Sequence, residues 1–145
     1  MHEYTSRFAT TDDIPNVVEW IHANREKNHY DPEIFQYDST RVMAVDKDGI
    51  PELYLPFQFT IMTDALAPRP GRFKREIAVA LKNAIHAVVR LAKKSKIGEI
   101  YFLCDPEDKE TEEFAKAHGY ECLNLKVMRL KPSKMSPPLP EDEKE

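Results

Sequence analysis

The stretch from Phe59 to Cys104 constrains the fold more than any other part of this 145-residue chain. An apolar segment over Phe59–Ala67 runs into a turn with two prolines, which lack the N–H that a continuing strand would need. Residues Arg75–Lys94 carry apolar side chains at spacings of three and four, which predicts a long amphipathic helix that stops at Gly98. Ile100–Cys104 is a short apolar run, typical of a strand buried on both faces. Together these segments predict a strand–helix–strand unit with parallel strands in one sheet.

The charge of the chain gathers in the middle of this unit. Residues 69–96 hold nine Lys and Arg side chains and one acid, Glu76, within a chain of net charge −4. The junction between a strand and the following helix is also where α/β sheets usually bind ligands. We therefore expect a localised anion site, not a surface for nucleic acid.

Length and composition predict one domain over residues 1–132 and a disordered, proline- and acid-rich tail over 133–145. No apolar run is long enough to span a membrane, and the N-terminus lacks an apolar signal segment. We interpret Cys104 and Cys122 as reduced, which favours a cytoplasmic protein. The five histidines have no ligand spacing, so we expect no metal site.

Before the central unit, the sequence predicts a strand, a helix and a hairpin. Tyr4–Ala9 is expected to be a strand with Phe8 in the core, and Thr10 is suited to cap the helix that follows. Arg41–Val45 and Leu53–Phe57 are expected to pair through an Asp-Gly turn, with prolines making the second strand irregular or edge-like.

After the central unit, the sequence predicts a helix and a last strand. The helix starts near Asp105-Pro106, buries Phe114 and Ala117, and stops at Gly119. Apolar and polar residues then alternate over Leu123–Leu130, which favours a final strand.

The order of these elements over Tyr4–Lys131 resembles the GNAT superfamily of N-acyltransferases. The segments that carry the resemblance are Arg7–Ile14, Leu66-Ala67-Pro68 with the basic turn and long helix, Glu113–Tyr120 and Met128-Arg129-Leu130. The resemblance implies an α/β (α+β) fold with a mixed, largely antiparallel sheet flanked by helices. It also implies that acyl-CoA inserts between the family's fourth and fifth strands.

The resemblance places the pyrophosphate of CoA at the turn before the long helix, where free N–H groups and the helix dipole attract anions. The implied cofactor-binding residues are Leu66, Ala67, Gly71, Arg72, Phe73, Lys74 and Arg75, with Arg69 adding charge. The family's loop usually reads Arg/Gln-x-x-Gly-x-Gly/Ala, whereas this turn offers Gly71 alone. Phe73 and Glu76 could distort the loop or point away from the phosphates, and the sequence leaves both readings open.

Asp64, at the end of the strand before the turn, is the candidate general base; its other reading is a cap on a local amide. The position of the family's catalytic tyrosine corresponds to Ala115, so solvent could supply the acid. Tyr101 and Cys104 could flank the thioester or belong to the core. A set of loop aromatics could form an acceptor pocket or merely cover the core: Tyr30, Phe35 and Tyr37.

The resemblance thus implies an acyl-CoA-dependent N-acyltransferase in which the amine attacks the thioester directly. Acetyl-CoA is the expected co-substrate, without a metal, and the acceptor is a small-molecule or peptide amine. The alternative is a catalytically impaired GNAT-like domain that acts as a binding or regulatory module. The sequence leaves open whether the chain is an active enzyme and whether it forms a homodimer.

Overall fold

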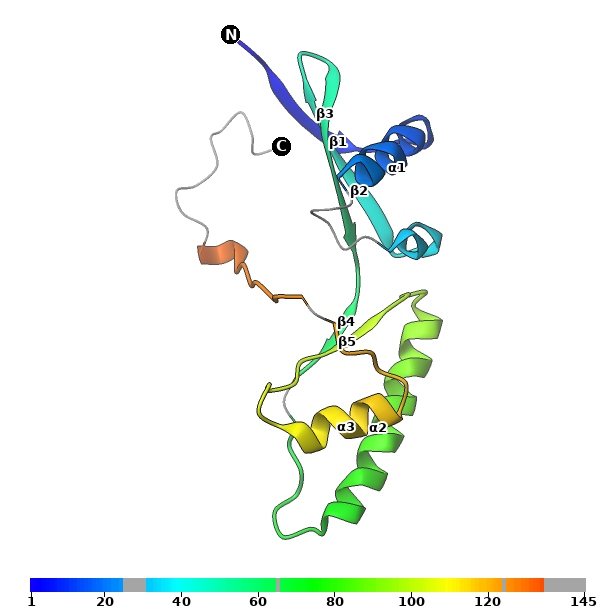
Figure 1. The fold of residues 1–145 in the computed structure, drawn as a ribbon, viewed down its shortest axis with the longest axis vertical. Helices are drawn as coiled ribbons and strands as arrows, with labels where there is room; N and C mark the ends of the chain where they lie inside the picture. Colours follow the sequence, from blue (N-terminus) through cyan, green and yellow to red (C-terminus); the bar gives the residue numbers. More distant parts are fainter. Residues whose placement is uncertain (25–30, 65, 124, 135–145) are drawn as a thin grey trace. The chain divides into compact units, whose positions relative to one another are not determined.

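The computed structural model of the chain describes residues 1–24, 31–64, 66–123 and 125–134 (Figure 1). The chain has two units, Met1–Lys109 and Glu110–Glu145. Tyr30 and most of the predicted tail lie outside the described residues. None of the described helices combines the length and the apolar composition needed to cross a membrane.

The first unit contains a three-stranded antiparallel sheet in the order β1-β2-β3. Its strands are β1 (Tyr4–Phe8), β2 (Thr40–Lys47) and β3 (Ile50–Gln58). The hairpin between β2 and β3 is confirmed, because Asp48 and Gly49 take φ angles of 52° and 80° at its turn. Positive φ at both central residues gives the turn a twist that matches the flanking strands. The proline-bearing β3 lies at the sheet edge, as predicted.

One face of this sheet is covered by α1 (Ile14–Ala23), which follows the short 3-10 helix η1 (Thr11–Asp13). Val17 of α1 and Ala44 of β2 are fully buried. The ring centroids of Trp20 and Tyr54 are 5.0 Å apart. Thr10 is an N-cap residue, as predicted, but it caps η1: its backbone N–H donates to Asp13 at 2.7 Å, and the α-helix itself begins at Ile14. The burial of Phe8 was predicted wrongly: its side chain is 63% exposed. Successive side chains of a strand point to opposite faces of the sheet. Because Arg7 points to the face that carries α1, Phe8 points to the other face.

The predicted strand–helix–strand unit is confirmed by β4 (Ile61–Thr63), α2 (Lys74–Lys94) and β5 (Ile100–Phe102). The strands β4 and β5 pair in parallel from Ile61↔Ile100 to Thr63↔Phe102. Both strands are shorter than predicted, and β5 is half-buried where burial on both faces was expected. In the described part of the chain, β4 and β5 make up a sheet of two strands.

The end of α2 differs from the prediction, because Gly98 is not its stop. The helix ends at Lys94, and Lys96 takes the left-handed conformation with a φ of 56°. The N–H of Lys96 donates to Lys93 O at 3.3 Å and the N–H of Ile97 to Ala92 O at 2.9 Å, which is a Schellman motif. Gly98 instead lies against the ring of Tyr37: a Cβ at this position would be 2.3 Å from Tyr37 Cγ.

The second unit contains most of α3 (Lys109–Ala117) and the 3-10 helix η3 (Pro132–Lys134). The stop at Gly119 is confirmed by its φ of 95°. The helix begins later than Pro106 because Asp105 instead caps a local turn, where its Oδ1 accepts the N–H of Glu107 at 2.9 Å. The predicted burial of Ala117 was wrong, since that residue is exposed.

The predicted final strand does not form in the described residues of 120–131. Alternation favours a strand only where a neighbouring strand supplies hydrogen bonds, and the described residues of 123–130 belong to neither of the two sheets. Val127 and Leu130 are accordingly 69% and 68% exposed.

Candidate functional site

A groove of about 400 Å³ lies beside the first three turns of α2, within the first unit. Its lining residues come from the segment after β4 and from one face of the helix: Leu66, Ala67, Pro68, Arg69, Arg72, Glu76, Ile77, Ala80, Leu81 and Ala84. The volume falls within the range of roughly 300–1,000 Å³ that is typical of small-molecule sites.

The helix wall of the groove follows from the spacing of its side chains. Ile77, Ala80, Leu81 and Ala84 are three or four residues apart and therefore share one face of α2. Two of them are alanines, whose small side chains leave space against the facing segment. The wall is therefore apolar over about two turns of helix.

The mouth of the groove carries the charged side chains. Arg72 Nη1 lies 3.9 Å from Glu76 Oε2, and both side chains are 50% exposed. The same Glu76 oxygen accepts the backbone N–H of Phe73, with 3.4 Å between the two atoms. Arg69 also lines the groove and forms no ion pair within the described part of the chain. The groove thus joins an apolar wall to a polar rim with an excess of arginine.

Three of the predicted cofactor-binding residues line this groove: Leu66, Ala67 and Arg72. Four do not: Gly71, Phe73, Lys74 and Arg75. The role of Gly71 is conformational, because the turn needs a φ of 79° at this position and residues with a Cβ rarely adopt that angle. Phe73 precedes the helix as its N-cap residue, and its side chain is 78% exposed. Of the two residues that depart from the family's loop, Glu76 is therefore the one at the site.

Asp64 directly follows β4 and is exposed. Its carboxylate forms no hydrogen bond with the described residues, so the reading as a local cap finds no partner here. Asp64 does not line the groove. Its role as a general base stays a prediction.

The remaining candidates have structural partners. The hydroxyl of Tyr101 donates to Glu99 Oε2 at 2.9 Å, and burial, aided by that carboxylate, raises the pKa of Tyr101 to about 12. The thiol of Cys104 donates to the backbone oxygens of Asp105 and Asp108 at 3.6 and 3.7 Å. Neither cysteine forms a disulfide.

Of the aromatic residues of the predicted acceptor pocket, Tyr30 lies outside the described residues, and the structure gives a clear packing partner for Tyr37. Tyr37 packs on Gly98. Burial, followed by the nearby Glu33, raises the pKa of Tyr37, so its hydroxyl stays protonated at neutral pH. No cluster of three His, Cys, Asp or Glu side chains that could hold a metal occurs among the described residues.

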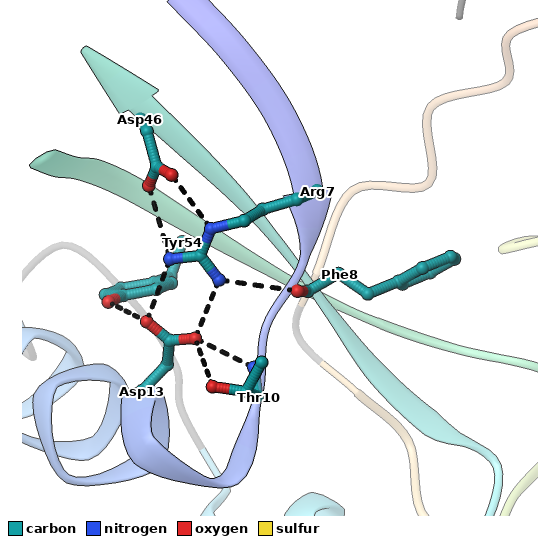
Figure 2. A network of polar contacts seen from close by, with 6 residues as sticks. All are labelled: Arg7, Phe8, Thr10, Asp13, Asp46 and Tyr54. Carbon is teal, nitrogen blue, oxygen red and sulfur yellow. Dashed lines mark hydrogen bonds and ion pairs between the residues drawn. The ribbon is translucent and has the colours of Figure 1, made fainter. Parts of the chain in front are cut away.

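Two features of the structure were missed in the sequence. The first is the pair of groove residues Ala80 and Ala84, which follow from helical spacing once Ile77 is placed at the wall. The second is a polar network in the first sheet, centred on Arg7 (Figure 2). The sequence could not link all of its members, because Asp46 and Tyr54 are far in the chain from Arg7 and Asp13.

In this network the guanidinium of Arg7 bridges two carboxylates. It donates to Asp13 at 2.8 and 3.1 Å and to Asp46 at 2.8 and 3.3 Å. Tyr54 donates its hydroxyl to Asp13 at 2.8 Å. The hydrogen bond from Arg7, followed by those from Thr10 and Tyr54, holds the pKa of Asp13 well below its usual range. The network joins β1, β2, β3 and the start of α1, and none of its residues lines the groove beside α2.

No family model matches the chain. No curated protein matches it either. Among solved structures, it is similar to AAC(6')-Iy in complex with a CoA-containing bisubstrate analogue, with 15% identity, a TM-score of 0.41, and coverage of 89% of this chain and 98% of that one.

It is also similar to a ribosomal-protein-alanine N-acetyltransferase from Brucella melitensis biovar Abortus. The identity is 11% and the TM-score 0.37, with coverage of 88% of this chain and 100% of that one. A further similar structure is an aminoglycoside acetyltransferase from an uncultured soil metagenomic sample in complex with sisomicin. Its identity is 15% and its TM-score 0.38, with coverage of 88% of this chain and 97% of that one.

These three solved structures are acetyltransferases. Each TM-score lies below 0.5, so the similarity by itself assigns neither a family nor an activity to this chain.

Proposed function

We propose that the chain is an acyl-CoA-dependent N-acyltransferase of the GNAT type, with acetyl-CoA as its donor. The observation that carries this proposal is the groove at the start of α2. It lies at the strand–helix junction of a parallel β4–α2–β5 unit, where the sequence resemblance places CoA. Its apolar wall and its arginine-bearing mouth also suit the two ends of CoA.

In this proposal the two ends of the ligand use different parts of the groove. The pantetheine arm would lie along Ile77 and Leu81, and its amides would reach the backbone of the segment after β4. The phosphates would contact Arg69 and Arg72, which present charged donors that suit phosphate oxygens. The first N–H groups of α2 and its dipole would add to this attraction.

The reaction would be a direct transfer. The amine nitrogen attacks the thioester carbonyl, a C–N bond forms, the C–S bond breaks, and the electron pair leaves with sulfur. Asp64, directly or through a water molecule, would accept the ammonium proton, while solvent would protonate the thiolate. Positioning of the amine and polarisation of the carbonyl by backbone donors would then supply most of the rate.

The first test is calorimetric titration of the whole chain with acetyl-CoA and with CoA. We expect micromolar binding, and we expect Arg72→Ala to weaken it about tenfold through loss of one charged contact. Arg90→Ala is the matched control, because it removes the same charge at an exposed residue of α2 that lies outside the groove. Equal losses in the two variants would contradict the groove as the phosphate site.

A second function, a GNAT-like binding or regulatory module without turnover, is favoured by one observation. Glu76 brings a negative charge to the place where phosphate would bind. Absence of binding at millimolar acetyl-CoA would favour this module. Binding followed by release of free thiol with one of a panel of amines would instead establish the enzyme.

A further inference from the structure

Glu76 is the one acid of the basic segment 69–96, and its carboxylate lies at the mouth of the groove. The same oxygen accepts the N–H of Phe73 at 3.4 Å and lies 3.9 Å from Arg72 Nη1. One carboxylate thus engages a backbone donor at the start of α2 and an arginine of the groove. These are the two kinds of donor that a phosphate group would use.

Both contacts of Glu76 are at the long end of their range. An N–H···O bond is usually about 2.9–3.0 Å between heavy atoms, so a separation of 3.4 Å is a weak one. The pair with Arg72 joins two half-exposed side chains, one before α2 and one in its first turn, and an exposed pair of this kind holds its charges only loosely. The carboxylate can therefore leave its donors without disrupting a buried network.

We propose that Glu76 is a resident anion of this groove, which a phosphate-bearing ligand must displace. This inference rests on the proposed function and deepens it, because it makes Glu76 the residue that sets the affinity for ligand phosphate. While Glu76 stays in place it neutralises part of the charge of Arg72. After displacement its negative charge remains nearby and repels the ligand.

The Glu76→Gln variant separates charge from structure. Glutamine keeps the length of the side chain, its helix propensity and an oxygen that can accept the N–H of Phe73. The substitution therefore removes the negative charge and leaves the start of the helix capped. Glu76→Asp does the opposite, since it keeps the charge on a shorter side chain.

The experiment measures CoA affinity by calorimetry for the wild-type chain, Glu76→Gln and Glu76→Asp. In low salt, we expect Glu76→Gln to bind CoA about three- to tenfold more tightly, and Glu76→Asp to show no such gain. The gain should shrink at roughly 0.5 M salt, where screening acts within a few ångströms. The matched control is Glu52→Gln, which makes the same change in net charge at an exposed residue of β3 outside the groove.

The outcomes keep this inference apart from the function on which it rests. If the wild type binds CoA and Glu76→Gln binds it equally or more weakly, the role of Glu76 is refuted and the CoA site stands. An equal gain in Glu52→Gln would also refute it, because the effect would then follow net charge. If CoA binds to neither the wild type nor Glu76→Gln, both proposals fail. If Glu76→Gln binds CoA and the wild type does not, the result would support the role of Glu76 and show that its charge prevents CoA binding in the wild-type chain.

Discussion

At the scale of single residues, the hydrogen bonds around Asp13 make the stability of the chain depend on pH. Its carboxylate accepts from Arg7, Thr10 and Tyr54, and its pKa in the folded chain is therefore depressed (Figure 2). A depressed folded-state pKa means that the ionised group stabilises the fold above the ordinary aspartate pKa of about 4. That contribution is lost as the pH falls below this value towards the folded-state pKa.

We therefore expect Asp13→Asn to lower the stability of the chain at pH 7 and to lose less stability than the wild type on acidification. Urea denaturation at pH 7, 5 and 3 measures both effects. Asp12→Asn, at the exposed neighbouring residue, is the control and should keep the wild-type pH dependence. Parallel pH profiles for the wild type and Asp13→Asn would contradict this assignment.

A second residue-scale prediction concerns Gly98, whose missing side chain makes room for a ring. An added Cβ would meet Tyr37 Cγ at 2.3 Å, and the atoms nearest to it belong to the base of the ring, which cannot swing away. Gly98→Ala should destabilise the fold by about 1–3 kcal/mol through overpacking, measured by urea denaturation. In a Tyr37→Ala background the same substitution should cost much less. A cost that persists without the ring would point to the backbone instead.

At the scale of elements, the end of α2 allows a test of its Schellman motif. Lys96 holds the left-handed position with a φ of 56°, which costs a residue with a Cβ roughly 1–2 kcal/mol. Lys96→Gly should therefore stabilise the chain by about 0.5–1 kcal/mol, after allowance for the greater freedom of glycine in the unfolded state. Its ion pair with Asp38 spans 4.0 Å between highly exposed groups and contributes little.

The control for Lys96→Gly is the same substitution one turn earlier. Lys93→Gly lies inside α2 and should destabilise the chain by about 1 kcal/mol, the usual cost of glycine in a helix. Thermal or urea denaturation of the two variants gives the comparison. Destabilisation by both would mean that the side chain of Lys96 contributes more than its backbone conformation costs.

The elements also show which parts of this fold a sequence can predict. The Asp48-Gly49 hairpin, the Thr10–Asp13 cap and the length of α2 were all predicted, because each depends on residues within a few positions of one another. Gly98 was interpreted wrongly because its partner, Tyr37, is remote in sequence. The final strand at Leu123–Leu130 was wrong for the same reason, since strand formation needs a partner that alternation alone does not specify.

The candidate site divides in the same way. The turn after β4 and the basic start of α2 were predicted from local composition, and Leu66, Ala67 and Arg72 do line the groove. Which other side chains face inward depends on how the segment after β4 runs beside the helix. That arrangement is tertiary, so Ala80 and Ala84 could not be assigned from composition.

At the scale of the whole molecule, the residues that line the groove all belong to the first of the two units. Ligand binding should therefore slow amide hydrogen exchange most strongly over residues 66–84, because a ligand that binds only the folded state suppresses local opening where it makes contacts. Exchange measured by mass spectrometry, with and without saturating acetyl-CoA, tests this. We expect protection in that segment of at least about tenfold if binding adds about 1.4 kcal/mol or more to the local opening energy.

The second unit supplies the internal reference for this measurement. Residues 110–117 of α3 line no part of the groove, so their exchange should change little on binding. The Arg72→Ala variant at the same ligand concentration should lose most of the protection over 66–84 while its unliganded exchange stays the same. Protection centred on any other segment would place the CoA site elsewhere and remove the basis for the roles given to Arg72 and Glu76.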